Sequence, residues 1–142
     1  MKFIGKTWKD EKTSLYVIEL PIVEVATQGK NPTNALDMMR ECIELHDPDL
    51  KFECIWTAKK SGEFALVTDD TKRMAAFILK RQREVNGLSQ KDIAAALGYS
   101  SHNSIAAYET GKREPTLGKF QELLDAMGLE VELTIKPRKK VG

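Results

Sequence analysis

Apolar and polar residues alternate along much of the first half of the chain, a spacing that predicts half-buried β-strands. The segments with this character are 3–8, 15–20, 22–27, 52–58 and 63–67. Between the third and fourth segments, Leu36, Met39 and Ile43 recur at helical spacing, which predicts a helix over 34–46 with Thr33 as its N-cap. The order β-β-β-α-β-β predicts a small α+β domain.

The second half has the apolar spacing of helices instead. The expected helices lie at 71–85, 89–97 and 116–127, and another opens in the 100–104 region and continues through Tyr108. Residues 129–135 then alternate as a strand, and we expect this lone strand to pair with a second copy of the chain. A basic tail follows at 136–140. The change of pattern near Thr68 predicts two domains, 1–68 and 69–142.

Local signals within residues 87–111 predict two short helices joined by a tight turn. Ser89 can cap the first helix, with Asp92 three residues later near the positive end of the helix dipole. Gly98 follows, where a left-handed C-cap suits glycine. The segments LSQKDIAAALG, SIAAYETGKREP and LGKFQELLDAMGL resemble the Cro/C1 (XRE) type of helix-turn-helix domain. The resemblance implies an all-α DNA-binding domain whose second short helix reads bases in a major groove.

The same resemblance assigns the DNA contacts residue by residue. The candidates are Gln90, Lys91, Ser101, His102, Asn103, Ala107, Thr110, Lys112 and Arg113. Gln90 begins the first helix, where a phosphate can be held, and Asn103 suits adenine. Ala107 offers base readout only through a thymine methyl, and the last three candidates are expected to hold phosphates. Such domains commonly pair residues at the places of Arg83 and Glu109, so we expect a partly buried ion pair here.

Composition adds constraints on the partners. The 142 residues, 42% of them hydrophobic, suffice for one ordinary domain or two small ones. The net charge is only +1, but residues 1–71 hold nine Lys/Arg and thirteen Asp/Glu, whereas residues 72–142 hold thirteen and eight. A basic half favours phosphates and an acidic half suits a basic protein. Chance variation in surface charge is the alternative explanation.

Other features argue against secretion, membrane insertion and catalysis. Cys42 and Cys54 have no metal-binding spacing, no signal peptide opens the chain, and no apolar run is long enough to cross a membrane, so we expect a cytoplasmic protein with reduced cysteines. A nuclease would need carboxylates gathered around Mg²⁺. The candidates lack a recognisable spacing: Asp10, Glu19, Glu24 and Asp37. We therefore expect no catalytic activity, no metal and no cofactor.

The segment YVIELPIVEVATQGKNPTNALDMMRECIEL resembles the N-terminal domain of HicB-type antitoxins, which implies a partial RNase-H-like fold. The shared pattern is a strand, a Pro-containing bend, a strand ending in T-x-G, and a helix entered through Thr. The matching residues are Tyr16, Pro21, Thr27, Gly29, Thr33 and Ala35. Many relatives have Pro-Gly-Cys after the bend, where this chain has Ile22-Val23-Glu24.

Together, the two resemblances imply an antitoxin of a type II toxin–antitoxin pair. Its partners would be a small, basic, mRNA-cleaving toxin of HicA type and the double-stranded operator DNA of its own operon, bound as a homodimer or a higher even-numbered oligomer. Residues 1–68 would then bind the toxin without the DNA-binding half. The alternative is a stand-alone XRE-family transcription regulator whose N-terminal domain builds an oligomer or senses a ligand. A short, basic neighbouring reading frame would favour the antitoxin.

Overall fold

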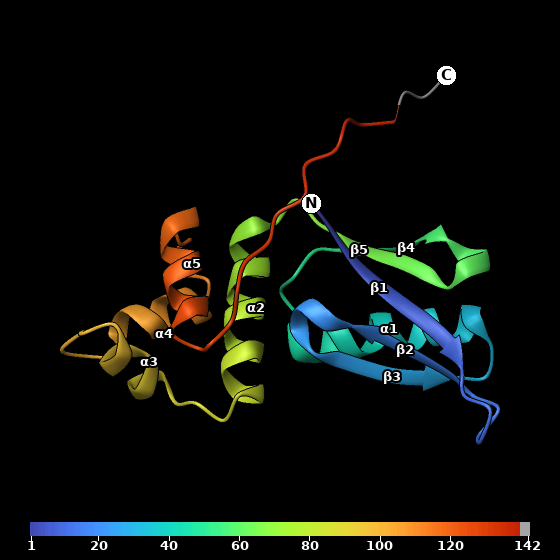
Figure 1. The fold of residues 1–142 in the computed structure, drawn as a ribbon, viewed down its shortest axis with the longest axis horizontal. Helices are drawn as coiled ribbons and strands as arrows, with labels where there is room; N and C mark the ends of the chain where they lie inside the picture. The colour runs from blue at the N-terminus through green and yellow to red at the C-terminus, as the bar shows by residue number, and fades with distance from the viewer. Residues whose placement is uncertain (140–142) are drawn as a thin grey trace.

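The computed structural model describes residues 1–139, which form a sheet domain and a helical domain with α2 between them (Figure 1). The elements of the sheet domain are β1 (Lys2–Lys9), β2 (Tyr16–Leu20), the 3-10 turn η1 (Pro21–Val23), β3 (Val25–Gly29), α1 (Pro32–His46), β4 (Glu53–Ala58), the 3-10 turn η2 (Lys59–Ser61) and β5 (Glu63–Val67). Those of the helical domain are α2 (Thr71–Val85), α3 (Gln90–Ala96), α4 (Asn103–Glu109) and α5 (Leu117–Asp125). The expected α+β order, followed by helices, is therefore present.

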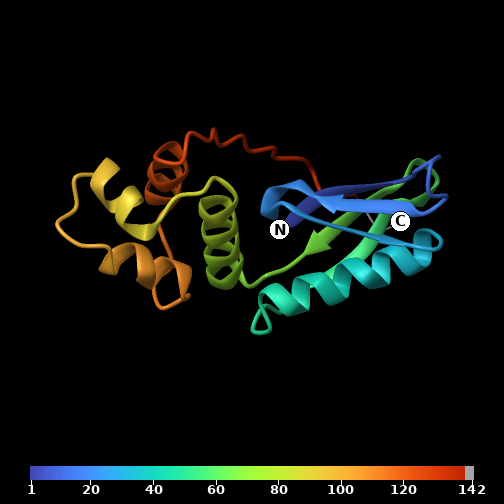
Figure 2. The same cartoon turned by 90° about the horizontal axis from the view of Figure 1, so that it is seen from below.

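The sheet has the strand order β3-β2-β1-β5-β4, and every neighbouring pair is antiparallel. The helix α1 connects the two edge strands and lies along one face of the sheet (Figure 2). Alternate side chains such as Ile18 and Phe64 point toward it and are fully buried with Met39 and Ile43 of α1. The apolar residues that alternate along the strands and those that recur at helical spacing along α1 thus form one buried layer.

Two boundaries in the sheet domain differ from the expected ones. The third strand begins at Val25, because Pro21 starts η1 and Glu24 has a φ of 49°, a left-handed backbone that ends the turn. The N-cap of α1 is Asn31, whose side-chain oxygen accepts a hydrogen bond from the backbone N–H of Asn34 at 2.8 Å. Thr33 therefore lies inside the helix, since Pro32 favours the first helical position.

Gly29 marks the closest approach of a strand to α1. It is buried, and a Cβ atom added there would lie 2.4 Å from the backbone nitrogen of Ala35 and 2.6 Å from its Cα atom. Any side chain at this position would therefore push the end of β3 away from the start of α1. The small residues of this part of the sequence are required by packing.

The helical domain follows the expected cap signals. Ser89 Oγ accepts from the N–H of Asp92 at 3.0 Å, and Asp92 Oδ2 accepts from the N–H of Ser89 at 2.7 Å, which completes a capping box on α3. These bonds to Ser89 hold the pKa of Asp92 below its usual value. Gly98 has a φ of 74° after the end of α3. Glu109, expected just after the recognition helix, is instead the last residue of α4.

The final helix and the segment after it differ from expectation. The apolar spacing of this helix predicts that Leu117 faces the core, but Leu117 is 64% exposed, because it is the first residue of α5 and lies beyond the packed interface. Residues 129–139 have no regular secondary structure: the segment first passes beside α2, where Leu129 and Val131 pack against the core, and its end extends away from the body of the molecule (Figure 1). The single chain therefore has no strand at 129–135, since a strand needs a hydrogen-bonded neighbour, and pairing with a second copy stays a prediction. Lys140, the end of the basic tail, lies outside the described residues.

The helix α2 belongs to the packing of both domains. Arg81 donates from Nε to the carbonyl of Val23 at 3.1 Å and from Nη2 to that of Glu24 at 2.9 Å, and Gln82 Nε2 donates to the carbonyl of Ile22 at 2.9 Å. The buried apolar residues of the two domains form one continuous cluster. A cut near Thr68 would fall between β5 and α2, but it would divide the core that the two domains share. The full chain is therefore the form to use in binding experiments.

The cysteines differ in their surroundings. Cys54 is buried on β4, and burial raises the pKa of its thiol to about 11, so the thiol stays protonated and unreactive at neutral pH. Cys42 is half-buried on α1. No helix within residues 1–139 is both long enough and apolar enough to span a membrane.

Candidate nucleic-acid interface

The helix α4 lies with one face buried and the other open to solvent. Ile105 and Tyr108 are buried against the helical core, where they meet Ile93 of α3. The opposite face forms a shallow hollow lined by small and polar side chains: Asn103, Ala106, Ala107, Thr110 and Lys112. Because these side chains are short along the middle of the helix, the edge of a DNA groove can approach the α4 backbone closely.

The ion pair expected between Arg83 and Glu109 is present and fixes the end of α4 to α2. Arg83 Nε and Nη2 donate to the Glu109 carboxylate at 2.9 and 2.8 Å, and Arg83 Nη1 donates to the carbonyl of Leu88 at 2.8 Å. The side chains are 13% and 3% exposed. Hydrogen bonding to Glu109 raises the pKa of Arg83, so the guanidinium stays charged throughout the physiological range.

A second arginine ties the exit of α4 to the sheet domain. Arg73 on α2 donates from Nη1 to the carbonyl of Thr110 at 2.8 Å and from Nη2 to Asp47 Oδ1 at 2.6 Å. Asp47 is buried just after α1. Gly111, with a φ of 75°, leaves room for this arginine, because a Cβ atom there would lie 2.7 Å from Arg73 Nη1. The recognition helix is thus positioned by both domains.

The turn between α3 and α4 is supported by α5. Lys119 Nζ donates to the hydroxyl of Tyr99 and to Glu122 Oε2, and it lies 5.2 Å from the centre of the Tyr99 ring. The bond with Glu122, followed by that with Tyr99, raises the pKa of Lys119. Tyr99 is thereby held where the chain enters the turn before the recognition helix.

The structure brings together four of the sequence-predicted DNA contacts, Asn103, Ala107, Thr110 and Lys112, in the hollow of α4. Ser101 and His102 lie in the turn directly before α4, and Ser101 Oγ accepts from the N–H of Asn103 at 3.3 Å. Gln90 and Lys91 open α3. Ala106 also lines the hollow and was not among the predicted contacts.

Two of the predicted phosphate contacts also make bonds within the protein. The hydroxyl of Thr110 donates to the carbonyl of Ala106 at 2.9 Å. The guanidinium carbon of Arg113 lies 5.3 Å from the centre of the Tyr108 ring. Lys112 is exposed at the rim of the hollow, which makes it the candidate best placed to reach a phosphate.

Sequence reasoning missed the role of Arg73 and Asp47. The two residues are 26 positions apart, and their spacing follows no local pattern. The two charges meet only because the end of α1 packs beside α2, and a buried charge needs such a partner. The sequence alone does not show that packing.

A family model described as helix-turn-helix matches residues 79–133, a span that begins in α2 and includes α3, α4 and α5. The match and the geometry of α3 and α4 define this part of the chain as a DNA-binding domain of the Cro/C1 type, as found in transcription regulators that bind double-stranded DNA. The sheet domain lies outside the matched span. No curated protein matches the chain.

Base readout by α4 predicts a loss of sequence preference when its first polar side chains are removed. Replacing His102 and Asn103 together with alanine should weaken binding to the DNA upstream of the gene about tenfold or more, because each good side-chain pair with a base contributes about 1–3 kcal/mol of discrimination. Binding to random duplex should change little. Fluorescence anisotropy with both duplexes measures the ratio of the two affinities.

Lys112→Ala provides the matched control for this prediction. It should weaken binding to both duplexes equally and reduce the salt dependence by about one unit of slope, since a phosphate contact carries no sequence information. An equal loss on both duplexes for the His102 and Asn103 variant would show that these residues do not read bases.

Proposed function

We propose that this protein is a HicB-type antitoxin, which neutralises a small, basic, mRNA-cleaving toxin of HicA type and represses its own operon by binding operator DNA. The observation that carries the proposal is the HicB-like segment from Tyr16 to Leu45, which lies in a sheet domain packed directly on a DNA-binding domain. The partial RNase-H-like assignment of the sheet domain is part of this proposal.

The motif residues of that segment occupy positions where their chemistry matters. Pro21 opens the bend between β2 and β3. Gly29 allows β3 to approach the backbone of Ala35 at the start of α1, where a Cβ atom at position 29 would clash, and Ala35 itself is fully buried. This packing gives a physical reason for the glycine of the T-x-G pattern and supports the resemblance.

The placement of the two domains supports two separate binding surfaces. The helices α3 and α4 lie at one end of the molecule, while α1 and β4 lie on the other side of α2 (Figure 1). The acidic first half suits a basic partner, and the basic second half suits DNA. One molecule can therefore hold toxin and operator together, so the level of toxin can influence repression.

The segment 129–135 supports an even-numbered oligomer. Leu129 and Val131 pack against the helical core, whereas Leu133 is 68% exposed and Ile135 is 95% exposed. Two copies of this alternating segment can pair as antiparallel strands, so that each satisfies the backbone hydrogen bonds of the other. Such a dimer places two recognition helices on two halves of one operator, as helix-turn-helix dimers do.

Co-expression with the product of a short, basic neighbouring reading frame tests the proposal. The full chain should restore growth to cells that express this toxin, and the two proteins should copurify. The DNA-binding variant with alanine at positions 102 and 103 is the control, and it should still restore growth. A chain that binds its upstream DNA but neither restores growth nor copurifies would instead be a stand-alone regulator.

A further inference from the structure

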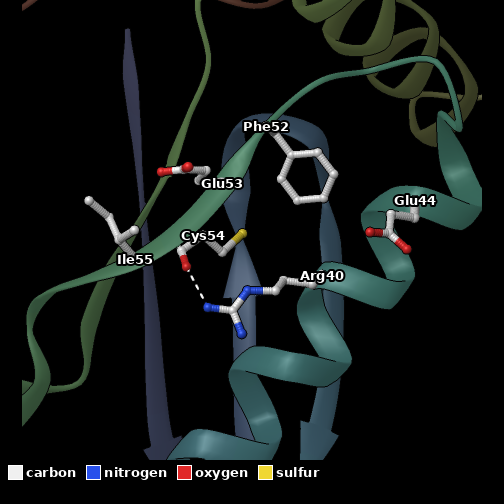
Figure 3. Close-up of a pocket in the computed structure, with 6 residues that line it drawn as sticks. All are labelled: Arg40, Glu44, Phe52, Glu53, Cys54 and Ile55. Atoms are coloured by element: carbon white, nitrogen blue, oxygen red, sulfur yellow. Dashed lines mark hydrogen bonds between the residues drawn. The ribbon is translucent and has the colours of Figure 1, made fainter.

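A groove runs between α1 and the edge strand β4 (Figure 3). It is lined by Arg40, Glu44, Phe52, Glu53, Cys54 and Ile55. The strands β3 and β4 are the two edges of the sheet, and α1 packs mainly over β3 and β2. The edge of β4 therefore lies beside the helix with room between them.

The backbone of β4 faces this groove. Arg40 Nη2 donates to the carbonyl of Cys54 at 2.7 Å, as Figure 3 shows, so this carbonyl points toward α1 and away from β5. In an antiparallel ladder the N–H and C=O of one residue point to the same side, so the N–H of Cys54 faces the groove as well. An edge strand with outward N–H and C=O groups can accept a further strand.

The rim of the groove is acidic. The charged residues that line it are two carboxylates, Glu44 and Glu53, and one cation, Arg40, which is paired with Asp37 at 2.6 Å. Glu44 on α1 and Glu53 on β4 are both exposed, and Glu41 is exposed one turn before Glu44. The side chain of Glu53 lies on the face of β4 that points away from α1 (Figure 3). Charge complementarity therefore favours a basic occupant.

Apolar surface accompanies these charges. The half-buried ring of Phe52 lines the groove, and Ile55 is 38% exposed at its side. Leu45 on α1, which does not line the groove, is 83% exposed, the highest value among the large apolar residues of the sheet domain. Because side chains alternate along a strand, Phe52 lies on the side of β4 that faces α1, whereas Ile55 and Glu53 lie on the other face. An extended segment beside β4 can therefore meet Phe52 and Glu44 on one face, and Ile55 and Glu53 on the other.

We propose that this groove docks an extended, basic segment of the toxin, which adds to the open edge of β4 and pairs its Lys or Arg side chains with Glu44 and Glu53. The inference rests on the proposed antitoxin function and names the surface through which it acts. On docking, a backbone N–H of the incoming segment takes the place of Arg40 at the Cys54 carbonyl. The DNA-binding face of α4 stays free.

Charge reversal in the full chain tests the docking site. The groove variant carries Glu44→Lys and Glu53→Lys, and the matched control carries Glu11→Lys and Asp69→Lys, the same charge change at exposed positions outside the groove. The groove variant should bind the copurified toxin about tenfold more weakly or worse, since like charges then face each other, while the control stays within about threefold of the wild type. A milder variant, Glu44→Gln with Glu53→Gln, should lie between them.

Two further readouts separate the possible failures. All variants should keep the DNA affinity of the wild type, which shows that they fold. Hydrogen exchange of the wild-type complex should show protection at residues 52–56 that the free chain lacks. Wild-type affinity in the groove variant, or no added protection at 52–56, would overturn the docking site while the antitoxin function stands. No complex between the toxin and the wild-type chain would overturn both.

Discussion

Replacing Glu109 with alanine should lower the free energy of unfolding by about 3 kcal/mol or more, because the Arg83 guanidinium would remain buried without its carboxylate partner. The pair is almost entirely shielded from water and has near-ideal distances, so solvent cannot replace the lost bonds. Since Glu109 is the last residue of α4, DNA binding should weaken along with stability. Urea denaturation followed by circular dichroism measures the change.

Glu122→Ala is the matched control for this prediction. Glu122 also pairs with a cation in the helical domain, Lys119 at 2.7 Å, but its side chain is 56% exposed. Exposed pairs contribute roughly 0–1 kcal/mol, so this variant should unfold close to the wild type. Equal, small effects of both substitutions would show that the recognition helix does not depend on the buried pair.

Replacing Leu133 and Ile135 with serine should convert the proposed dimer into a monomer and weaken binding to the upstream DNA about a hundredfold or more. The reason is that two linked recognition helices bind their half-sites far more tightly than either binds alone. Both residues are exposed in the single chain, so the substitutions leave its folded core intact. Analytical ultracentrifugation and anisotropy measure the two effects.

The polar face of the same segment provides the comparison. Glu132→Ser with Thr134→Ser changes the alternate side chains, and this variant should remain dimeric and keep most of its DNA affinity. If the wild type is monomeric at the concentrations at which it binds DNA, or if the two double variants behave alike, the segment does not form the dimer contact.

Helices with explicit local signals could be predicted from the sequence. The capping box of Ser89 and Asp92 is complete within four residues, so α3 begins where the sequence predicts. The bounds of α2 likewise follow from its apolar spacing and from Asn86-Gly87 after it. The Arg83–Glu109 pair is predicted only from the resemblance to a domain type, because its members are 26 positions apart and no local pattern joins them.

Other features depend on contacts that the local sequence does not contain. Ile22 and Val23 look like strand residues, but Pro21 and the left-handed Glu24 place them in a turn. Leu117 has helical spacing and yet lies at an exposed helix start. Segment 129–135 has the alternation of a strand, but a strand forms only beside another strand, which one copy of the chain does not supply here.

The groove between α1 and β4 could not be predicted from the sequence, for a similar reason. Arg40 and Cys54 are 14 residues apart, and only the packing of α1 beside the edge of the sheet joins them. The acidic balance of the first half indicated a basic partner, but it did not indicate a surface.

In the proposed function, one chain binds toxin and operator through separate surfaces. Native mass spectrometry of the full chain mixed with the product of the short, basic neighbouring reading frame and the upstream DNA duplex tests this. We expect a single assembly that contains all three components, with an even number of chains on each duplex. A toxin that never joins the chain, or that joins only chains without DNA, would contradict it.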